Sequence, residues 1–419
     1  MLYDSFGTQI GIRLNIKQEK MESGAKEEKK IAGIERNVFF AGLTSFLTDT
    51  STKMIYCIMP LFLLSIGASK TQLSLIEGIA ESTAAILKAL SGYWCDRIGR
   101  NKPFMLAGYA VTAVISPLYA LARTPLNVLL MRFIERVGKG IRTAPRDSLI
   151  AGSSRCVVTG KNFGFHKAMD NCGALAGPLL AFFILSRAPS EYTRVFLFSG
   201  IPAFLGVMTI LFFIRETGRC PGMPAPRISL RDFSPKFYAF LGIVFVFSLG
   251  NSTDALLLVR ASEVGVANAM IPFAYLVFNA VSVLFAVPLG LLSDRIGKER
   301  LILSGFLLYA GVYCGFGAAH LKITIFLLFA LYGLYSAATD GVQKALVSDL
   351  VDKERRGTAL GLYNTVLGLA LLPASLIAGL LYDRVNSGAP FYFGASMALL
   401  AAVLMLFFLL GGKKKAELK

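Results

Sequence analysis

The chain has 419 residues, of which 55% are hydrophobic and 16% charged, with a formal net charge of +17. So large an apolar fraction exceeds that of ordinary soluble domains, and a lipid bilayer is the expected environment. In a soluble protein the excess of Lys and Arg would suggest nucleic acid as the partner. Here the bases gather in every second loop between apolar segments, as cytoplasmic loops of membrane proteins do, so no nucleic-acid partner is expected.

Twelve segments are predicted to form membrane-spanning helices. A helix needs about 20 mostly apolar residues to cross the hydrocarbon, where no water can bond stray backbone groups. The fourth, fifth and tenth segments are the least apolar. The predicted spans are 37–65, 72–94, 103–122, 126–148, 162–186, 193–215, 236–260, 265–292, 300–318, 323–348, 356–381 and 389–411.

The loop charges predict the orientation of the chain. Bases follow the even-numbered spans, for example Arg97, Arg100 and Lys102 after the second. Both termini are therefore expected in the cytoplasm of a multi-pass protein of a bacterial inner membrane. Residues 1–36 contain no apolar signal-peptide core and are expected to form a solvated cytoplasmic tail, and 412–419 a short basic tail.

The chain reads as two copies of one unit. The stretch 216–235 is rich in Pro, Gly and Arg and is predicted to be a cytoplasmic linker between six-helix bundles at 37–215 and 236–411. The tetrapeptide Asp-Arg-Ile-Gly occurs after the second predicted helix of each bundle, at 96–99 and 294–297. Two such bundles facing one another can enclose a cavity at the membrane midplane.

These loops carry a family pattern, Gly-x-x-x-Asp-Arg-x-Gly followed by a base. Over residues 37–411 the sequence resembles the major facilitator superfamily, which implies two pseudo-symmetric six-helix bundles and a secondary transporter that works by alternating access. An Asp at a helix C-terminus needs compensation, such as a neighbouring helix N-terminus or an Arg. The resemblance implies that the loop joins the halves on the cytoplasmic side while the cavity opens outward. The residues that match are Gly92, Asp96, Arg97, Gly99 and Arg100, and then Gly290, Asp294, Arg295 and Gly297.

A second family pattern, Arg-x-x-x-x-x-Gly-x-Gly, is met in the fourth span by Arg132, Gly138 and Gly140. The same helix carries a stripe of further charges, and charged side chains are costly against lipid, so this face is expected to line the cavity. Arg142 and Arg146, nearer the cytoplasm, are instead expected to extend to the membrane surface. The other members of the stripe are Glu135, Arg136 and Lys139.

Several carboxylates share the membrane with these bases. A buried acid beside an Arg can bind or release a proton as the Arg moves, so transport is predicted to be proton-coupled. The alternative is that the charges are static ion pairs that fix helix packing. The residues assigned to coupling and gating are Asp49, Glu77, Glu81, Glu135, Arg132 and Asp170.

The expected substrate is a small charged organic solute: an anion such as a polycarboxylate or metal chelate, or a zwitterion, because basic side chains suit anionic groups. Alternatives are a proton-antiport multidrug exporter and a non-transporting membrane sensor. Gly173-x-x-x-Gly177-Pro178 suits either close helix packing or an exporter motif, so the direction of transport stays open. The predicted substrate-binding residues are Lys53, Tyr56, Arg136, Lys139, His166, Asn251, Asp254, Asp340 and Lys344.

Other chemistries have no sequence support. The six cysteines form no CxxC pair and the chain has two histidines, so neither a metal nor another cofactor is expected. No GxxxxGK[ST] loop is present for ATP and no nucleophile constellation stands out, so the protein is not expected to be an enzyme. Its expected partners are the solute, protons and lipid, and one chain already supplies both bundles, so a monomer is expected.

Overall fold

The structure is a computed structural model that describes residues 30–31, 33–98, 100–153, 159–216, 233–352 and 355–417. The described part is almost entirely helical. The first half contains α2 (Arg36–Tyr56), α3 (Met59–Ser65), α4 (Lys70–Ile98), α5 (Lys102–Leu118), α6 (Pro125–Gly152), α7 (Thr159–Arg187) and α8 (Tyr192–Phe213). The second contains α9 (Pro235–Gly250), α10 (Ala255–Glu263), α11 (Ile271–Ile296), α12 (Lys298–Ala318), α13 (Lys322–Asp349), α14 (Arg356–Arg384) and α15 (Ala389–Glu417). Two short 3-10 helices are also present. η1 (Tyr119–Leu121) directly follows α5, and η3 (Asn268–Met270) directly precedes α11.

The helices follow the twelve predicted segments in order, with two interruptions. The segment 37–65 is divided into α2 and α3, and 236–260 is divided at residues 251–254 between α9 and α10. Within the described residues, nine helical stretches are long and apolar enough to cross a membrane. The segments 37–65, 72–94 and 126–148 do not meet this criterion, because charged side chains interrupt them. The protein is thus an integral multi-pass membrane protein, and twelve remains the predicted number of crossings.

Several helices begin as their sequences predict. Pro125 and Pro235 occupy the first turns of α6 and α9, where no intrahelical partner for the missing N–H is needed. The hydroxyl of Thr124 accepts a hydrogen bond from the Asn127 amide, and that of Ser234 accepts one from Phe237, each at 3.3 Å. Local chemistry therefore fixes where these helices start.

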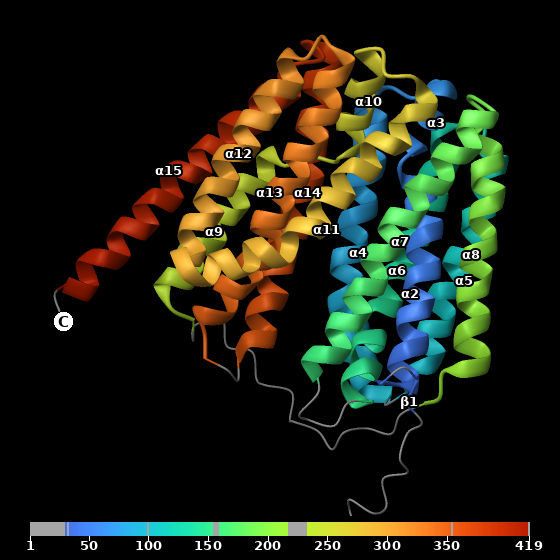
Figure 1. Ribbon diagram of the computed structural model, residues 1–419, viewed down its shortest axis with the longest axis horizontal. Coiled ribbons are helices and arrows are strands. Elements are labelled where there is room, and N and C mark those ends of the chain that lie inside the picture. Colours follow the sequence, from blue (N-terminus) through green and yellow to red (C-terminus); the bar gives the residue numbers. More distant parts are fainter. Residues whose placement is uncertain are drawn as a thin grey trace, which may run out of the picture.

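The two halves lie side by side (Figure 1), with α4 packed on α14 and α7 on α11 across their boundary. We call the end that carries residues 66–70, 263–268 and 384–389 the outer end, after its predicted extracytoplasmic position, and the opposite end the inner end. Figure 1 shows the helices of the two halves close together at the outer end, near α3 and α10, and farther apart at the inner end.

Glycines allow close helix contacts in the first half. A Cβ added at Gly173 of α7 would lie 2.6 Å from the Phe46 carbonyl oxygen of α2, and one at Gly177 would lie 2.6 Å from that of Thr50. Gly138 of α6 is similarly close to Gly108 of α5. The Gly173-x-x-x-Gly177 motif therefore serves helix packing in this structure.

The predicted tails differ from the structure near both bundles. Residues 30–31 and 34–35 form the antiparallel strands β1 (Lys30–Ile31) and β2 (Ile34–Glu35), and Ile34 and Glu35 are buried, so this part of 1–36 is not a solvated tail. The Asn37 side chain joins the start of α2 to Arg215 by two hydrogen bonds of 3.0 and 3.1 Å. Helix α15 continues to Glu417, past the predicted end at 411. Residues 1–29, 32, 217–232 and 418–419, which hold most of the predicted tail and linker, lie outside the described residues.

Candidate functional site

A cavity of about 450 Å³ lies between the two halves. All six bases in its described lining come from the first half, together with three acids. The second half contributes two acids, with aromatic and polar side chains around them. The basic residues are Lys53, Arg136, Lys139, Arg142, Arg146 and Lys167, and the acidic residues are Asp49, Glu81, Asp170, Asp254 and Asp340.

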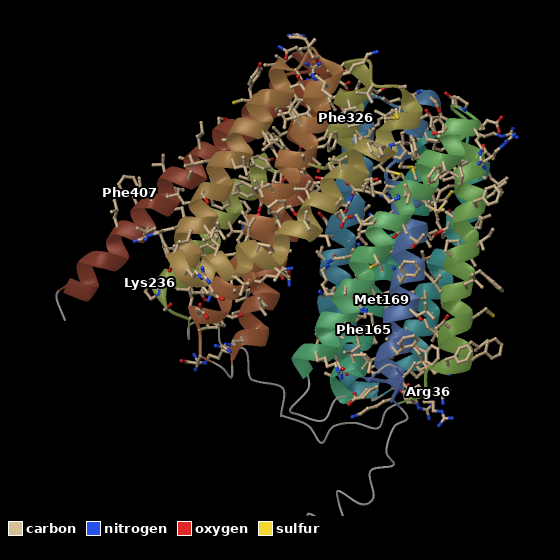
Figure 2. The ribbon with its side chains drawn as sticks, viewed as in Figure 1. Arg36, Phe165, Met169, Lys236, Phe326 and Phe407 are labelled. Atoms are coloured by element: carbon tan, nitrogen blue, oxygen red, sulfur yellow. The ribbon has the colours of Figure 1, made fainter. Side chains whose placement is uncertain are left out.

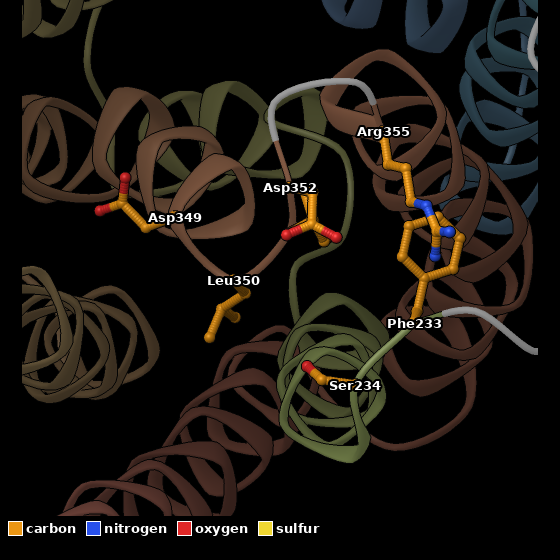
Figure 3. Close-up of a pocket in the computed structure, with 7 residues that line it drawn as sticks. Phe233, Ser234, Asp349, Leu350, Asp352 and Arg355 are labelled. Carbon is orange, nitrogen blue, oxygen red and sulfur yellow. The ribbon is translucent and has the colours of Figure 1, made fainter.

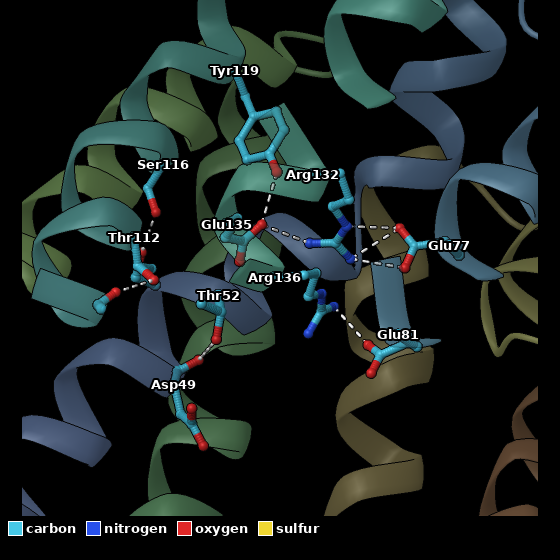
Figure 4. A network of polar contacts seen from close by, with 12 residues as sticks. Asp49, Thr52, Glu77, Glu81, Thr112, Ser116, Tyr119, Arg132, Glu135 and Arg136 are labelled. Carbon is cyan, nitrogen blue, oxygen red and sulfur yellow. Dashed lines mark hydrogen bonds and ion pairs between the residues drawn. The ribbon is translucent and has the colours of Figure 1, made fainter. Parts of the chain in front are cut away.

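Behind the cavity wall, Arg132 holds two carboxylates inside the first half (Figure 4). Its Nε donates to Glu77 Oε1 at 2.9 Å and its Nη2 to Glu77 Oε2 at 3.0 Å. Its Nη1 donates to Glu135 Oε2 at 3.0 Å, which also accepts from the Tyr119 hydroxyl at 2.7 Å. All three charged side chains are at most 3% exposed. The expectation that this part of the stripe faces the cavity is wrong: Arg132 and Glu135 are turned into the α4–α5–α6 bundle.

One turn along α6, the pair Arg136 and Glu81 does belong to the wall. Arg136 Nη2 lies 2.8 Å from Glu81 Oε1, and Glu81 is 35% exposed whereas Arg136 is 7% exposed. The Nε of Arg136 is buried and finds no hydrogen-bond partner in the described part of the chain. This Arg therefore has donor capacity that its carboxylate does not use.

Lys53 of α2 reaches across to the second half. Its ammonium donates to the Tyr275 hydroxyl of α11 at 3.0 Å and lies 5.4 and 5.3 Å from the ring centres of Tyr56 and Tyr275. Although Asp49 precedes it by one helical turn, no ion pair joins these two described residues. The cation is held by a hydroxyl and two aromatic faces.

A polar cluster forms the α2–α7 side of the cavity. His166 Nε2 lies 2.7 Å from Ser45 Oγ and 3.8 Å from Asp170 Oδ1, and the His side chain is buried behind the cavity wall. Asp49 faces the same stretch of α7, because a Cβ at Gly173 would lie 3.0 Å from its own Cβ. The first half thus brings two carboxylates to one part of the wall.

The expectation that Arg142 and Arg146 reach the membrane surface is wrong, since both line the cavity. Arg142 is 5% exposed; its Nη1 donates to Thr112 Oγ1 at 2.7 Å and its guanidinium lies 4.2 Å from the Tyr109 ring centre. Arg146 pairs with Asp147 at 2.9 Å. A neighbouring helix with a hydroxyl and an aromatic face accommodates Arg142, so it does not need to extend along lipid.

In the second half, the predicted residues divide into two groups. Asp254 lies where α9 gives way to α10 and accepts a hydrogen bond from the Tyr332 hydroxyl at 2.8 Å, and Asp340 accepts one from Ser336 at 2.6 Å. Asn251 accepts a bond of 3.3 Å from the Tyr309 hydroxyl and Lys344 is exposed, and neither is part of the described cavity lining.

Sequence reasoning missed several lining residues. Lys167 and Asn171 follow His166 and Asp170 by one position each, which places them on the flank of the same helical face. Tyr275 and Asn279 stand one turn apart on α11, a pattern common in helix cores. A search for polar residues beside a charged stripe would have found Lys167 and Asn171. No sequence pattern distinguishes Tyr275 and Asn279. Further missed residues are Thr52, Thr143, Ser282 and Ser336.

The repeated loop lies at the inner end. Gly297 has φ +96°, a conformation that favours glycine, and Asp294 and Arg295 before it are exposed. Lys298 pairs with Asp349, which lines a second cavity of about 250 Å³ at the inner end of the second half (Figure 3). Gly290 lies in the last turns of α11.

The first copy of the loop ends α4. Gly92, Asp96 and Arg97 are in its last turns, but their side chains, and all of Gly99, lie outside the described residues. Arg100, which follows, is exposed. The predicted role of this copy in joining the halves stays a prediction.

Known proteins share this organisation. A family model described as Major Facilitator Superfamily matches residues 41–258 and again 238–419. An uncharacterised MFS-type transporter of Methanocaldococcus jannaschii is 32% identical over 94% of this chain and 99% of its own. The multi-drug resistance efflux pump PmrA of Streptococcus pneumoniae is 25% identical over 76% of this chain and 82% of its own.

Solved structures agree on the fold. A POT family transporter crystallised with a thioalcohol-conjugated peptide superposes with a TM-score of 0.78 at 13% identity, covering 92% of this chain and 98% of that one. At this identity the likeness concerns the fold alone. The two matches to the family model and the relative of 32% identity indicate a transporter rather than an enzyme, and they show that the chain belongs to the major facilitator superfamily.

Proposed function

We propose that the protein carries a small charged organic solute across the membrane by alternating access, and that this solute is a zwitterion. The carrying observation is the division of charge in the cavity. In the described lining the first half supplies six bases and three acids, whereas the second half supplies Asp254 and Asp340. A solute with an anionic group toward the first half and a cationic group toward the second would complement both walls.

Two bases of α6 support the anionic end of this pose. Arg136 and Lys139, one turn apart, both line the cavity. In the second half, Asp254 and Asp340 each accept a hydrogen bond from a neutral hydroxyl through one oxygen, which leaves the other oxygen for a cation. A polycarboxylate or metal chelate would satisfy the bases but would approach these two acids with like charge, so the zwitterion is favoured.

We propose that proton coupling depends on carboxylates in the cavity wall and not on those buried around Arg132. Glu81 is partly exposed and pairs with Arg136 in the cavity wall, so a solute anion could compete for that Arg and leave Glu81 to take a proton. Asp49 and Asp170 are a second candidate pair. Glu77 and Glu135 are fully enclosed around Arg132, which suits a static role.

The test begins with thermal unfolding of purified protein in detergent with three probes: glycylglycine as zwitterion, succinate as dianion and tetraphenylphosphonium as lipophilic cation. We expect glycylglycine to stabilise most. Arg136→Gln and Asp254→Asn should each weaken the binding of glycylglycine about tenfold or more, since each removes a charged hydrogen-bond partner. Arg194→Gln, at an exposed base outside the cavity, is the matched control. Stabilisation by succinate that survives in Asp254→Asn, with none by glycylglycine, would refute the zwitterion.

The second candidate, a proton-antiport multidrug exporter, has a specific basis. PmrA, a multi-drug resistance efflux pump, is a relative at 25% identity, and Tyr56, Tyr275 and Phe278 give the cavity an aromatic side. This function predicts that tetraphenylphosphonium stabilises the protein and that the effect is lost in Asp254→Asn but not in Arg136→Gln.

The remaining parts of the proposal concern setting and assembly. With both termini in the cytoplasm of an inner membrane, the close approach of the halves at the outer end would make this an inward-facing form. We propose that one chain is the transporting unit. Mass measurement of the detergent-purified protein, and labelling of single cysteines from either side of the membrane, would test these points.

A further inference from the structure

At the outer end, the last turn of α14 meets the first turn of α4 across the boundary between the halves. Asp383 Oδ2 accepts a hydrogen bond from the Thr71 amide at 2.8 Å, and Oδ1 accepts one from the Lys70 amide at 3.3 Å. These amides are among the first of α4, which have no partner inside their own helix. A carboxylate of the second half therefore caps a helix of the first.

A second contact stands beside this cap. Lys70 Nζ lies 3.5 Å from Glu263 Oε1 and 5.8 Å from the ring centre of Tyr382, whose hydroxyl donates to Glu263 Oε2 at 2.6 Å. Both members of the Lys70–Glu263 pair are 32% exposed, so solvent weakens it. Asp383 is exposed as well, so solvent weakens both contacts, but the cap sets one carboxylate against two backbone amides of the other half.

Below the cap, α4 and α14 touch along small residues. A Cβ at Gly379 would lie 2.7 Å from Thr71 Cα, and one at Gly78 would lie 2.9 Å from Ser375 Cβ. The Ser82 hydroxyl donates to the Gly368 carbonyl at 2.8 Å. We call this contact the α4–α14 seam. Because the seam is so close, the halves cannot part at the outer end without drawing Asp383 away from Thr71.

We propose that Asp383 is a positioning residue of the transport cycle: its carboxylate caps α4 while the outer end is closed, and the cap is lost whenever that end opens. The proposal rests on alternating access but not on the identity of the solute. Removing the carboxylate removes an interaction that only the closed form makes, so the population shifts toward the outward-open form.

Accessibility of the seam measures that population. Ser74 lies in the seam and is fully buried. In a variant with all six native cysteines replaced by Ala, Ser74→Cys is accessible to a polar maleimide only after the outer end opens. We expect Asp383→Ala to raise its labelling rate roughly five- to tenfold, the factor that loss of a charged helix cap produces.

Matched variants separate the cap from general damage. Asp383→Asn keeps one acceptor without the charge and should give an intermediate rate, and Glu263→Gln, which spares the cap, should change the rate less than either. Glu191→Ala removes an exposed carboxylate at the same end whose partner, Arg194, is in the same half, and should leave the rate unchanged. Thermal unfolding of each variant reports whether it is folded.

Two results would overturn the proposal: labelling of Ser74→Cys unaffected by Asp383→Ala in a folded protein, or the same rise with Glu191→Ala. If Asp383→Ala does not fold, Asp383→Asn and Glu263→Gln carry the comparison, and equal rates in these two would equally refute the cap. A negative result here with a normal response to glycylglycine would leave the proposed function intact.

Discussion

Arg132 and Glu77 face one another in a two-point ion pair inside the first half, with contacts of 2.9 and 3.0 Å. Glu135 takes the remaining side of the guanidinium, so neither carboxylate can leave without exposing a charge to an apolar interior. This arrangement makes the network a structural centre of the first half.

The first prediction concerns its stability. Arg132→Ala should destabilise the protein by about 3–5 kcal/mol, because two buried carboxylates lose their cation. Arg132→Lys should not restore stability, since an ammonium cannot make the two-point contact. Thermal unfolding in detergent measures the loss, with the exposed Arg194→Ala as control. Equal melting of Arg132→Ala and Arg194→Ala would contradict the assigned role.

A second prediction tests the contact between α2 and α7. Gly173→Ala places a methyl 2.6 Å from the Phe46 carbonyl oxygen and should cost about 1–3 kcal/mol through forced separation of the helices. Gly164→Ala, in the same helix, meets nothing within 4 Å and should be neutral or stabilising. The difference in melting temperature between the two variants is the measurement, and its absence would show that the helices can move apart freely.

A third prediction concerns proton coupling. Glu81→Gln keeps a hydrogen-bond partner for Arg136 but cannot exchange a proton, so a pH gradient should no longer drive accumulation in liposomes, whereas exchange of solute across the membrane should persist. The solute used is whichever probe stabilises the purified protein. Glu191→Gln is the control. Gradient-driven accumulation that survives in Glu81→Gln would remove this residue from coupling.

A fourth prediction concerns the repeated loop. If Asp96 joins the halves at the inner end in the outward-open form, Asp96→Asn should favour the inward-facing form and slow transport. Labelling at Ser74→Cys should then fall, opposite to the effect of Asp383→Ala. Unchanged labelling together with unchanged transport would show that this Asp only shapes a turn.

The order and approximate limits of the helices follow from the sequence because apolar length is a strong signal in a membrane protein. The breaks between α2 and α3 and between α9 and α10 do not follow from the sequence. Residues 251–254 lie between two apolar runs, and the α9–α10 break is stabilised by contacts such as that between Tyr332 and Asp254, which come from a distant helix.

The charged stripe on α6 also has contacts with other helices that the sequence alone does not predict. Helical periodicity places Arg132 and Arg136 away from lipid, and both are buried. Periodicity cannot distinguish a cavity from the interior of a bundle, so it missed that Arg132 faces α4 and Glu77. The hydrogen-bond partner of Lys53 could not be predicted from the sequence either, because Tyr275 is 222 positions away in the other half.

The α4–α14 seam also encloses two hydroxyls, those of Ser74 and Ser375, that find no hydrogen-bond partner among the described residues. Each buried polar group left in this condition costs about 1–3 kcal/mol, and water reaches both as soon as the seam separates. Dehydration of these two serines thus works against the attraction that Asp383 supplies, and it narrows the free-energy difference between the closed and the parted seam.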